Sequence, residues 1–295
     1  MRTGVAQIKQ NYVGAEMQTD FEFLTVEVSG RVATVTIDNP PINIITLPLY
    51  AELMQLVQTL QREPELSVVV FKSAHPDFFL AHFDVAAILQ FPTEEAAERN
   101  PEPNPFHQMC ERLRTMNKVT IAQIEGRVGG GGSELASSMD MRFGVIDKTV
   151  INQMEVPLGI LPGGSGTQRL PRLVGRGRAL EIILGGVDID AATAERWGLL
   201  NRIYPAADIN QAVADLAHRI ARFPQPAVRL AKASVNAAEL PLSQGLEEEA
   251  YLFARLLRTP EAQQAMQKFM ANGGQTHAGE MRIAELVDEL RRNGE

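Results

Sequence analysis

The stretch Gly129-Gly130-Gly131-Gly132-Ser133-Glu134 is the strongest structural signal in this chain. It follows an apolar segment at 119–124 and precedes helix-compatible residues at 135–139. Four consecutive glycines lose much conformational entropy on folding, so a folded domain needs a local reason to keep them. The pattern predicts a loop that leads into a helix, whose free N–H groups face an anion or an oxygen that becomes negative during a reaction. A flexible turn is the alternative interpretation; the acid at position 134 favours a site.

The composition is that of an ordinary globular protein, with 45% hydrophobic and 22% charged residues among 295. A formal net charge of −8 argues against a surface built for nucleic acid or anionic lipid. The single cysteine, Cys110, excludes an internal disulfide, and the five histidines show no metal-ligand spacing. No apolar run reaches the roughly 18–20 residues that span a bilayer, and no signal or transit pattern is present. We expect a cytoplasmic protein without a metal, a nucleic-acid partner or a membrane partner.

Strand and helix patterns alternate through the first two thirds of the chain. Residues 32–37 alternate apolar and polar side chains, as in a half-buried strand. Leu49, Leu53, Leu56, Val57 and Leu60 recur at helical spacing. Residues 68–71 form a continuous apolar run that is typical of a strand buried on both faces. The alternation predicts an α/β architecture.

Three regions are expected along the chain. Residues 1–20 are polar and unpatterned, which predicts a flexible N-terminal segment. Residues 21–206 carry the α/β pattern and both glycine-rich turns, and residues 207–295 carry helical patterns punctuated by prolines. Within the core, three alternating prolines between residues 90 and 106 predict a surface loop that could cover a cleft.

A second glycine-rich turn, 161–170, lies close to another acid, Glu155. Glu155 stands among apolar residues, and burial would raise its pKa and make the carboxyl group usable as an acid and as a base. The two carboxyl groups, each tied to a glycine-rich turn, could converge on one water or one substrate carbon. Taken singly, Glu134 and Glu155 could also be a helix N-terminal charge and a surface acid.

A third motif, Phe79-Leu80-Ala81-His82-Phe83-Asp84-Val85, follows the buried strand. With Gly126–Ala136 and Glu155–Leu170 it matches, in order, three motifs of the crotonase family, the enoyl-CoA hydratases and isomerases, which the chain resembles over about residues 24–270. The resemblance implies a spiral of repeated ββα units with an all-helical C-terminal region. It also implies a homotrimer, or a homohexamer of stacked trimers.

The resemblance further implies an acyl-CoA-processing enzyme. The backbone N–H groups of Phe83 and Gly131 would form an oxyanion hole for the thioester carbonyl, and Glu134 and Glu155 would be the catalytic acids. No permanently bound cofactor is implied, because coenzyme A arrives as part of the substrate. The residues expected to contact substrate or coenzyme A are Ala81, His82, Asp84, Val85, Gly130 and Gly163.

Several positions depart from the family pattern. His82 replaces a glycine, which would strain the backbone if that position has positive φ, and Phe83 replaces a small alanine. Met154 replaces a proline, and Ser165 replaces a glycine. The two acids favour an enoyl-CoA hydratase. The alternatives are another reaction on an acyl-CoA (isomerisation of a double bond, decarboxylation or thioester hydrolysis) and a non-catalytic acyl-CoA-binding protein.

Overall fold

The structure is a computed structural model that describes residues 20–94, 96 and 98–292. The N-terminal segment expected to be flexible therefore lies, apart from Asp20, outside the described residues. The strands are β1 Leu24–Ser29, β2 Val32–Ile37, β3 Val68–Ser73, β4 Phe78–Leu80, β5 Val119–Ile124, β6 Arg127–Gly129, β7 Met141–Val145, β8 Val150–Asn152, β9 Ile189–Asp190 and β10 Arg202–Tyr204.

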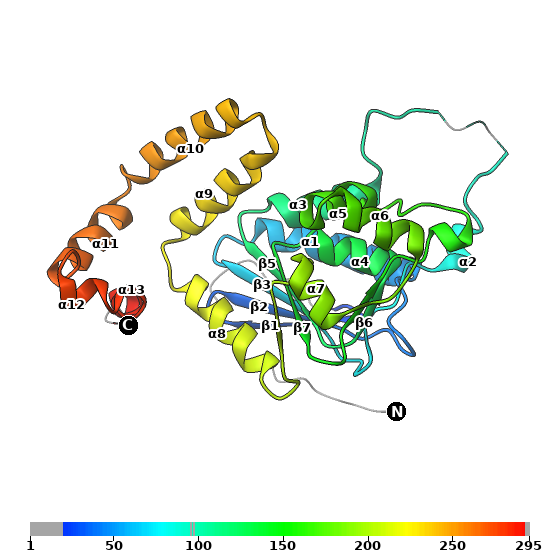
Figure 1. The fold of residues 1–295 in the computed structure, drawn as a ribbon, viewed down its shortest axis with the longest axis horizontal. Coiled ribbons are helices and arrows are strands. Elements are labelled where there is room, and N and C mark those ends of the chain that lie inside the picture. Colours follow the sequence, from blue (N-terminus) through cyan, green and yellow to red (C-terminus); the bar gives the residue numbers. More distant parts are fainter. Residues whose placement is uncertain (1–19, 95, 97, 293–295) are drawn as a thin grey trace.

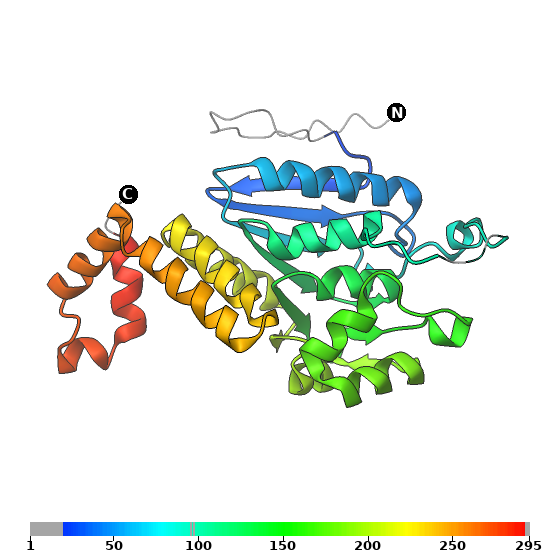
Figure 2. The same cartoon turned by 90° about the horizontal axis from the view of Figure 1, so that it is seen from above.

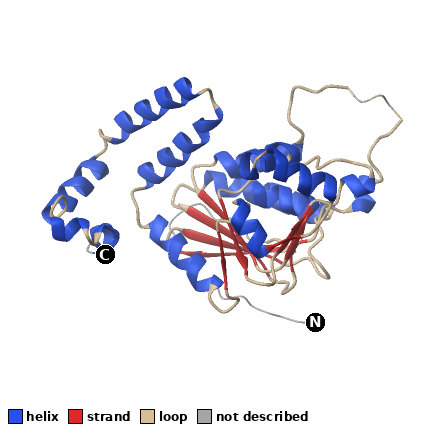
Figure 3. Cartoon of the chain, viewed as in Figure 1, coloured by secondary structure: helices blue, strands red, loops and turns tan. Residues whose placement is uncertain are grey.

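Helices cover the strands and continue as a long C-terminal region (Figures 1 and 3). The α-helices are α1 Leu47–Arg62, α2 Val85–Ile88, α3 Pro105–Thr115, α4 Gly130–Ser137, α5 Gly166–Val174, α6 Arg176–Gly185, α7 Ala191–Trp197, α8 Ile209–Ala221, α9 Gln225–Asn236, α10 Leu242–Leu256, α11 Pro260–Ala271, α12 His277–Glu280 and α13 Ile283–Arg292. Two 3-10 turns, η1 Val156–Leu158 and η2 Ala237–Glu239, complete the described elements.

The strands form two sheets that the chain visits in alternation. A six-stranded sheet has the order β1-β2-β3-β5-β7-β10, and a four-stranded sheet has the order β4-β6-β8-β9. Each of the successive pairs β3–β4, β5–β6 and β7–β8 contributes one strand to each sheet and is followed by a helical segment. Neighbouring strands β3, β5 and β7 are parallel, as are β4, β6 and β8. This repetition is the ββα spiral that the motifs implied.

Strand β3 of the six-stranded sheet is buried on both faces, as the apolar run at 68–71 predicted. Val69 and Phe71 point into the main core, which includes the buried side chains of α1 and α3. Val68 and Val70 point the other way, against Val213 of α8. The sheet is therefore covered by helices on both sides, which suits parallel strands.

Helix α1 shows how the local sequence specifies an element. Thr46 caps its N-terminus by accepting a hydrogen bond from the Leu49 N–H at 3.4 Å, and Pro48 in the first turn fits the helical φ. Its buried residues are the five that the helical spacing predicted: Leu49, Leu53, Leu56, Val57 and Leu60.

The described part of residues 207–295 is helical, as the sequence predicted. Helix α8 packs on the six-stranded sheet, and α9 pairs with α10. Helices α10 to α13 then extend away from the core as an arm (Figures 1 and 2). No described helix is long and apolar enough to cross a membrane.

The glycine run differs from the expected loop, because α4 begins within it. Gly130 is the first residue of the helix and has a φ of 44°, which glycine adopts without steric strain. Gly132 packs so closely that a methyl group added to it would lie 2.6 Å from both the carbonyl oxygen and Cβ of Leu80. The run is therefore needed for close backbone packing against β4.

This close packing predicts opposite effects for two glycine-to-alanine changes in helices. Gly132→Ala should destabilise the protein by about 1–3 kcal/mol, because the new methyl group overpacks the contact with Leu80. Gly177→Ala, in the first turn of α6, meets no atom within 4 Å and should stabilise by about 0.4–1 kcal/mol. Urea unfolding of both variants measures the difference; equal free energies of unfolding would contradict the packing argument.

Candidate active site

Three neighbouring strands of the smaller sheet each lead into a segment of the candidate site. Phe83 follows β4, Gly131 and Glu134 follow β6, and Glu155 follows β8. These strands are adjacent and parallel, so their carboxyl ends meet at one edge of the sheet. That edge is where open parallel sheets usually bind ligands. Topology therefore brings together motifs that are about 70 residues apart in the sequence.

Phe83 and Gly131 lie in contact. A methyl group on Gly131 would be 3.1 Å from Phe83 Cβ and 3.5 Å from Phe83 N. Ile45 donates its N–H to the His82 carbonyl at 2.8 Å and accepts from the Asp84 N–H at 3.1 Å. In such a parallel bridge the N–H of Phe83 points away from Ile45. The N–H of Gly131 belongs to the first turn of α4, where no preceding carbonyl of the helix accepts it. Two adjacent main-chain donors of this kind can stabilise a negative oxygen.

Glu134 is a buried carboxyl group with a defined set of donors. Its Oε1 accepts the N–H groups of Gly164 at 2.8 Å and Gly166 at 2.7 Å. Its side chain is buried, and this burial raises its pKa to about 7, although the two N–H donors oppose the rise. A carboxyl group with this pKa exchanges protons near neutral pH.

Glu155 is also buried, and burial raises its pKa, whereas the nearby His82 lowers it. The fully buried amide of Gln153 orients it. In the amide orientation that satisfies both of its polar atoms, the nitrogen donates to Glu155 Oε2 at 2.9 Å and to Oε1 at 3.2 Å, and the oxygen accepts from Ser133 Oγ at 3.1 Å. Ser133 directly precedes Glu134, so one side-chain bridge connects the segments that carry the two acids.

The two acids face one cavity of about 660 Å³. Three aromatic rings form part of its wall: Tyr50 lies 5.8 Å from both Phe83 and Phe106, measured between ring centroids. The other wall residues are mostly apolar and come from α2, the loop before α3, and the segment around η1. Such a cavity suits an apolar group attached to a polar, reacting centre.

His82, Val85, Gly130 and Gly163 line this cavity, together with Phe83, Gly131 and both acids. Ala81 and Asp84 are not among the described lining residues. Ala81 is buried beside Gly129, and Asp84 caps α2 by accepting a hydrogen bond from the Ala86 N–H at 2.9 Å. Eight of the ten predicted site residues therefore surround one space, and these two support its wall.

The backbone of His82 does not have the positive φ that would strain a histidine where the family has a glycine. Among the described residues, the non-glycine residues with positive φ are Asn43, Asp147, Ser165 and Gln275. The Nδ1 of His82 lies 2.8 Å from the Phe83 carbonyl oxygen. Since a carbonyl only accepts, Nδ1 carries the proton of this bond, and in neutral imidazole Nε2 remains an acceptor.

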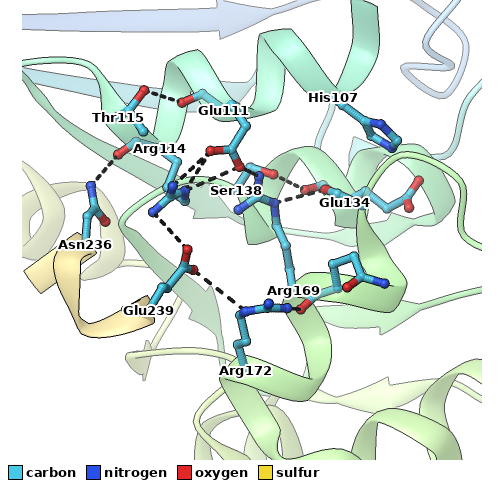
Figure 4. Close-up of polar contacts among 12 residues, drawn as sticks. His107, Glu111, Arg114, Thr115, Glu134, Ser138, Arg169, Arg172, Asn236 and Glu239 are labelled. Carbon is cyan, nitrogen blue, oxygen red and sulfur yellow. Dashed lines mark hydrogen bonds and ion pairs between the residues drawn. The ribbon is translucent and has the colours of Figure 1, made fainter. Parts of the chain in front are cut away.

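Sequence reasoning missed several residues that hold the acids. His107 donates from Nε2 to the Gly163 carbonyl at 2.7 Å, next to the turn that binds Glu134. The sequence did not predict the contact of Gln153 with Glu155. Figure 4 shows a further polar network in which Glu111 binds both Arg114 and Arg169, while the hydroxyl of Ser138 donates to the main-chain carbonyl of Glu134 at 2.8 Å. His107 and Glu111 are four residues apart on α3, and this helical spacing was the available signal.

Within the described residues, no group of three or more histidine, cysteine, aspartate or glutamate side chains could hold a metal ion.

This chain is similar to known proteins over most of its length. A model of the family described as enoyl-CoA hydratase/isomerase matches residues 27–278. A probable enoyl-CoA hydratase, echA8, of Mycobacterium bovis is 31% identical over 252 residues, covering 85% of this chain and 95% of that protein. A solved structure of a putative enoyl-CoA hydratase from Streptomyces avermitilis is 36% identical with a TM-score of 0.67, covering 92% of this chain and 99% of that one. An enoyl-CoA hydratase from Bacillus anthracis aligns with a TM-score of 0.77 at 27% identity, covering 85% and 96%.

The raised pKa of Glu134 predicts a pH-dependent stability. The folded protein binds this proton more tightly than the unfolded chain, whose glutamate has a pKa near 4.5. The contribution of this group to stability is thus fully present below pH 4.5 and is lost as pH rises through about 7. Glu134→Gln removes the free-energy cost of deprotonating this buried carboxyl group. The free energy of unfolding of the variant should therefore exceed that of the wild type by up to about 3 kcal/mol at pH 8 and by much less at pH 5.

Urea unfolding at the two pH values measures this effect, with Glu247→Gln on exposed α10 as the control for loss of one charge. A stability advantage of Glu134→Gln that is the same at both pH values would contradict the assignment of the proton to Glu134.

Proposed function

Since the chain belongs to the enoyl-CoA hydratase/isomerase family and is an acyl-CoA-processing enzyme, we propose that it adds water across the double bond of a 2-enoyl-CoA thioester. One observation carries the proposal: two buried carboxyl groups and two main-chain N–H groups surround one largely apolar cavity. The reaction needs both sets of groups, because it moves two protons and passes through a negative thioester oxygen.

The N–H groups of Phe83 and Gly131 hold the thioester carbonyl oxygen in this proposal. Attack of water on the β-carbon pushes electrons towards that oxygen, and fixed donors stabilise the resulting enolate. Main-chain donors need no reorientation during the reaction. A single donor of this kind is worth about 3–4 kcal/mol of barrier.

Glu134 takes the proton from water, and Glu155 supplies the proton that the α-carbon receives. The two N–H donors on Glu134 favour its charged form, which suits a base. They occupy Oε1, so Oε2 serves for proton exchange. Burial of Glu155 favours its neutral form, which suits an acid. The water oxygen bonds to the β-carbon and keeps one of its protons as the new hydroxyl group. Glu134 then passes the other proton to Glu155, which restores both acids to their starting states.

The aromatic wall of Tyr50, Phe83 and Phe106 holds the acyl group of the substrate. Phe106 reaches the acid itself: a methyl group on Gly164 would lie 2.7 Å from a Phe106 ring carbon and 2.5 Å from Glu134 Oε2. The acyl chain therefore passes an apolar surface directly beside the base. His82, Val85, Gly130 and Gly163 line the path of the thioester and the pantetheine part of coenzyme A.

We further propose that the chain assembles as a homotrimer or a homohexamer through its C-terminal helices. Large apolar side chains are exposed there, among them Leu242 at 78%, Phe253 at 62% and Val235 at 73%. Apolar surface of this extent on a helical arm indicates contact with another chain.

The two acids separate hydration from the other reactions considered. Glu134→Gln and Glu155→Gln should each lower the rate of hydration by about 10²–10⁴-fold. The double variant should be little worse than either single one, because the two groups act as a unit. The measurement follows loss of the conjugated thioester absorbance with short-, medium- and long-chain 2-enoyl-CoA substrates, with exposed Glu181→Gln of α6 as the control.

An isomerase would instead need Glu155 and largely tolerate Glu134→Gln. An acyl-CoA-binding protein would turn over no substrate, and its affinity for CoA esters would change less than about tenfold, or 1.4 kcal/mol, in either variant. Either result would replace the hydratase proposal.

The assembly proposal predicts that the mass in solution is three or six times that of one chain. Phe253→Asp and Leu242→Asp place charges on the exposed apolar face of α10 and should dissociate the assembly, while Glu247→Gln on the same helix should not. Light scattering coupled to size exclusion measures the mass, and a wild-type monomer at micromolar concentration would rule out this assembly.

A further inference from the structure

The buried acid Glu134 receives its donors from a turn outside its own helix. Both N–H groups on its Oε1 come from residues 163–166, which we call the cradle. The position of the carboxyl group therefore depends on how firmly the cradle is held. Gly164 lies so near that a methyl group on it would be 2.5 Å from Glu134 Oε2.

The cradle contains a residue in an unfavourable backbone conformation. Ser165 has a φ of 101°, a region that side-chain-bearing residues rarely adopt. Its hydroxyl accepts a hydrogen bond from Arg169 Nε at 2.9 Å, and its carbonyl accepts one from the Arg169 N–H at 2.9 Å. Arg169 therefore binds Ser165 through both its side chain and its main chain, and these two hydrogen bonds stabilise the strained turn.

Arg169 is in turn held by helix α3. Its guanidinium pairs with Glu111, which also binds Arg114 at 2.9 Å (Figure 4). The Arg169 side chain is only 11% exposed. One turn earlier on α3, His107 donates to the Gly163 carbonyl at 2.7 Å. Two side chains on one face of α3 thus support the cradle, His107 directly at Gly163 and Glu111 through Arg169 at Ser165.

We propose that Arg169, anchored by Glu111 and bound to Ser165, is a positioning residue that fixes the cradle and through it the carboxyl group of Glu134. The inference rests on the proposed function, because it gives Arg169 its role through the base of the hydration reaction. Arg169 itself touches no substrate. It acts by keeping the N–H groups of Gly164 and Gly166 on Glu134 Oε1, so that Oε2 stays directed at the water.

Arg169 also acts on Glu134 through its charge. Burial raises the pKa of Glu134, and the Arg169 cation opposes that rise. The titratable groups that face Glu134 are Glu155 from the segment after β8, Arg169 from α5 and Cys110 from α3. Loss of the cation removes this opposition and leaves the effect of Glu155, which also raises the pKa, so the pKa of Glu134 should rise further.

The test compares Arg169→Met with Arg172→Met, which removes a cation from the same helix. Arg172 is 59% exposed and faces Glu239 instead of the cradle. Arg169→Met should lower kcat by about 10²-fold, the usual effect of a small misplacement of a reacting group, with KM nearly unchanged. The acidic limb of its pH–kcat profile should move to higher pH. Arg169→Lys should restore the pH profile more than kcat, and Arg172→Met should match the wild type.

Two substitutions at Ser165 test the cradle without removing the cation. Ser165→Ala loses the hydroxyl and keeps the strain, so kcat should fall. Ser165→Gly loses the same hydroxyl but tolerates the positive φ, so its kcat should exceed that of Ser165→Ala. These two variants also decide the matter if Arg169→Met does not fold.

The outcomes separate the inference from the proposed function. If Glu134→Gln is inactive while folded Arg169→Met and Ser165→Ala keep the wild-type kcat and pH profile, the positioning role is wrong. Equal activities of Ser165→Ala and Ser165→Gly, both below the wild type, would also overturn the argument from strain. If Glu134→Gln is as active as the wild type, the proposed function fails instead.

Discussion

Close packing of main chain against main chain is the constraint on which this molecule depends. Residues 129–132 lie against residues 80–83 at distances that leave no room for a side chain at Gly132. The contact joins the ends of β4 and β6 and brings Phe83 against Gly131. It also starts α4 at the point from which Glu134, one turn later, reaches the cavity. The fold and the site therefore share one contact.

Local patterns predicted the elements well because each was specified by residues within it. The five apolar positions of α1 and the two-sided burial of β3 follow directly from periodicity. The glycine run and the two acids were found because glycines are costly to order and a carboxyl group beside them is unusual. The start of α4 was placed too late, since a run of glycines alone indicates a turn and only its packing partner makes it a helix.

The support of the site could not be predicted in the same way. His107 and Glu111 lie on α3, and they support residues 163–166 directly at Gly163 and through Arg169 of α5; the distance between α3 and α5 is set by tertiary packing. Ser165 was noticed as a departure from a glycine pattern, but its positive φ and its hydrogen bond to Arg169 emerge only from the structure. Ala81 and Asp84 carry the motif without lining the cavity, because Ala81 packs beside Gly129 and Asp84 caps α2.

We propose that the N–H groups of Phe83 and Gly131 hold the thioester oxygen, and their main-chain origin has a consequence for how new activities could arise. A donor on the main chain persists whatever side chain is attached to the same residue. The walls at Tyr50, Phe106 and His82 can therefore be exchanged while the reacting frame stays in place. A scaffold of this kind separates the chemistry of the thioester from the choice of acyl group, so laboratory evolution towards a different acyl group should begin at these walls and leave the glycine contact unaltered.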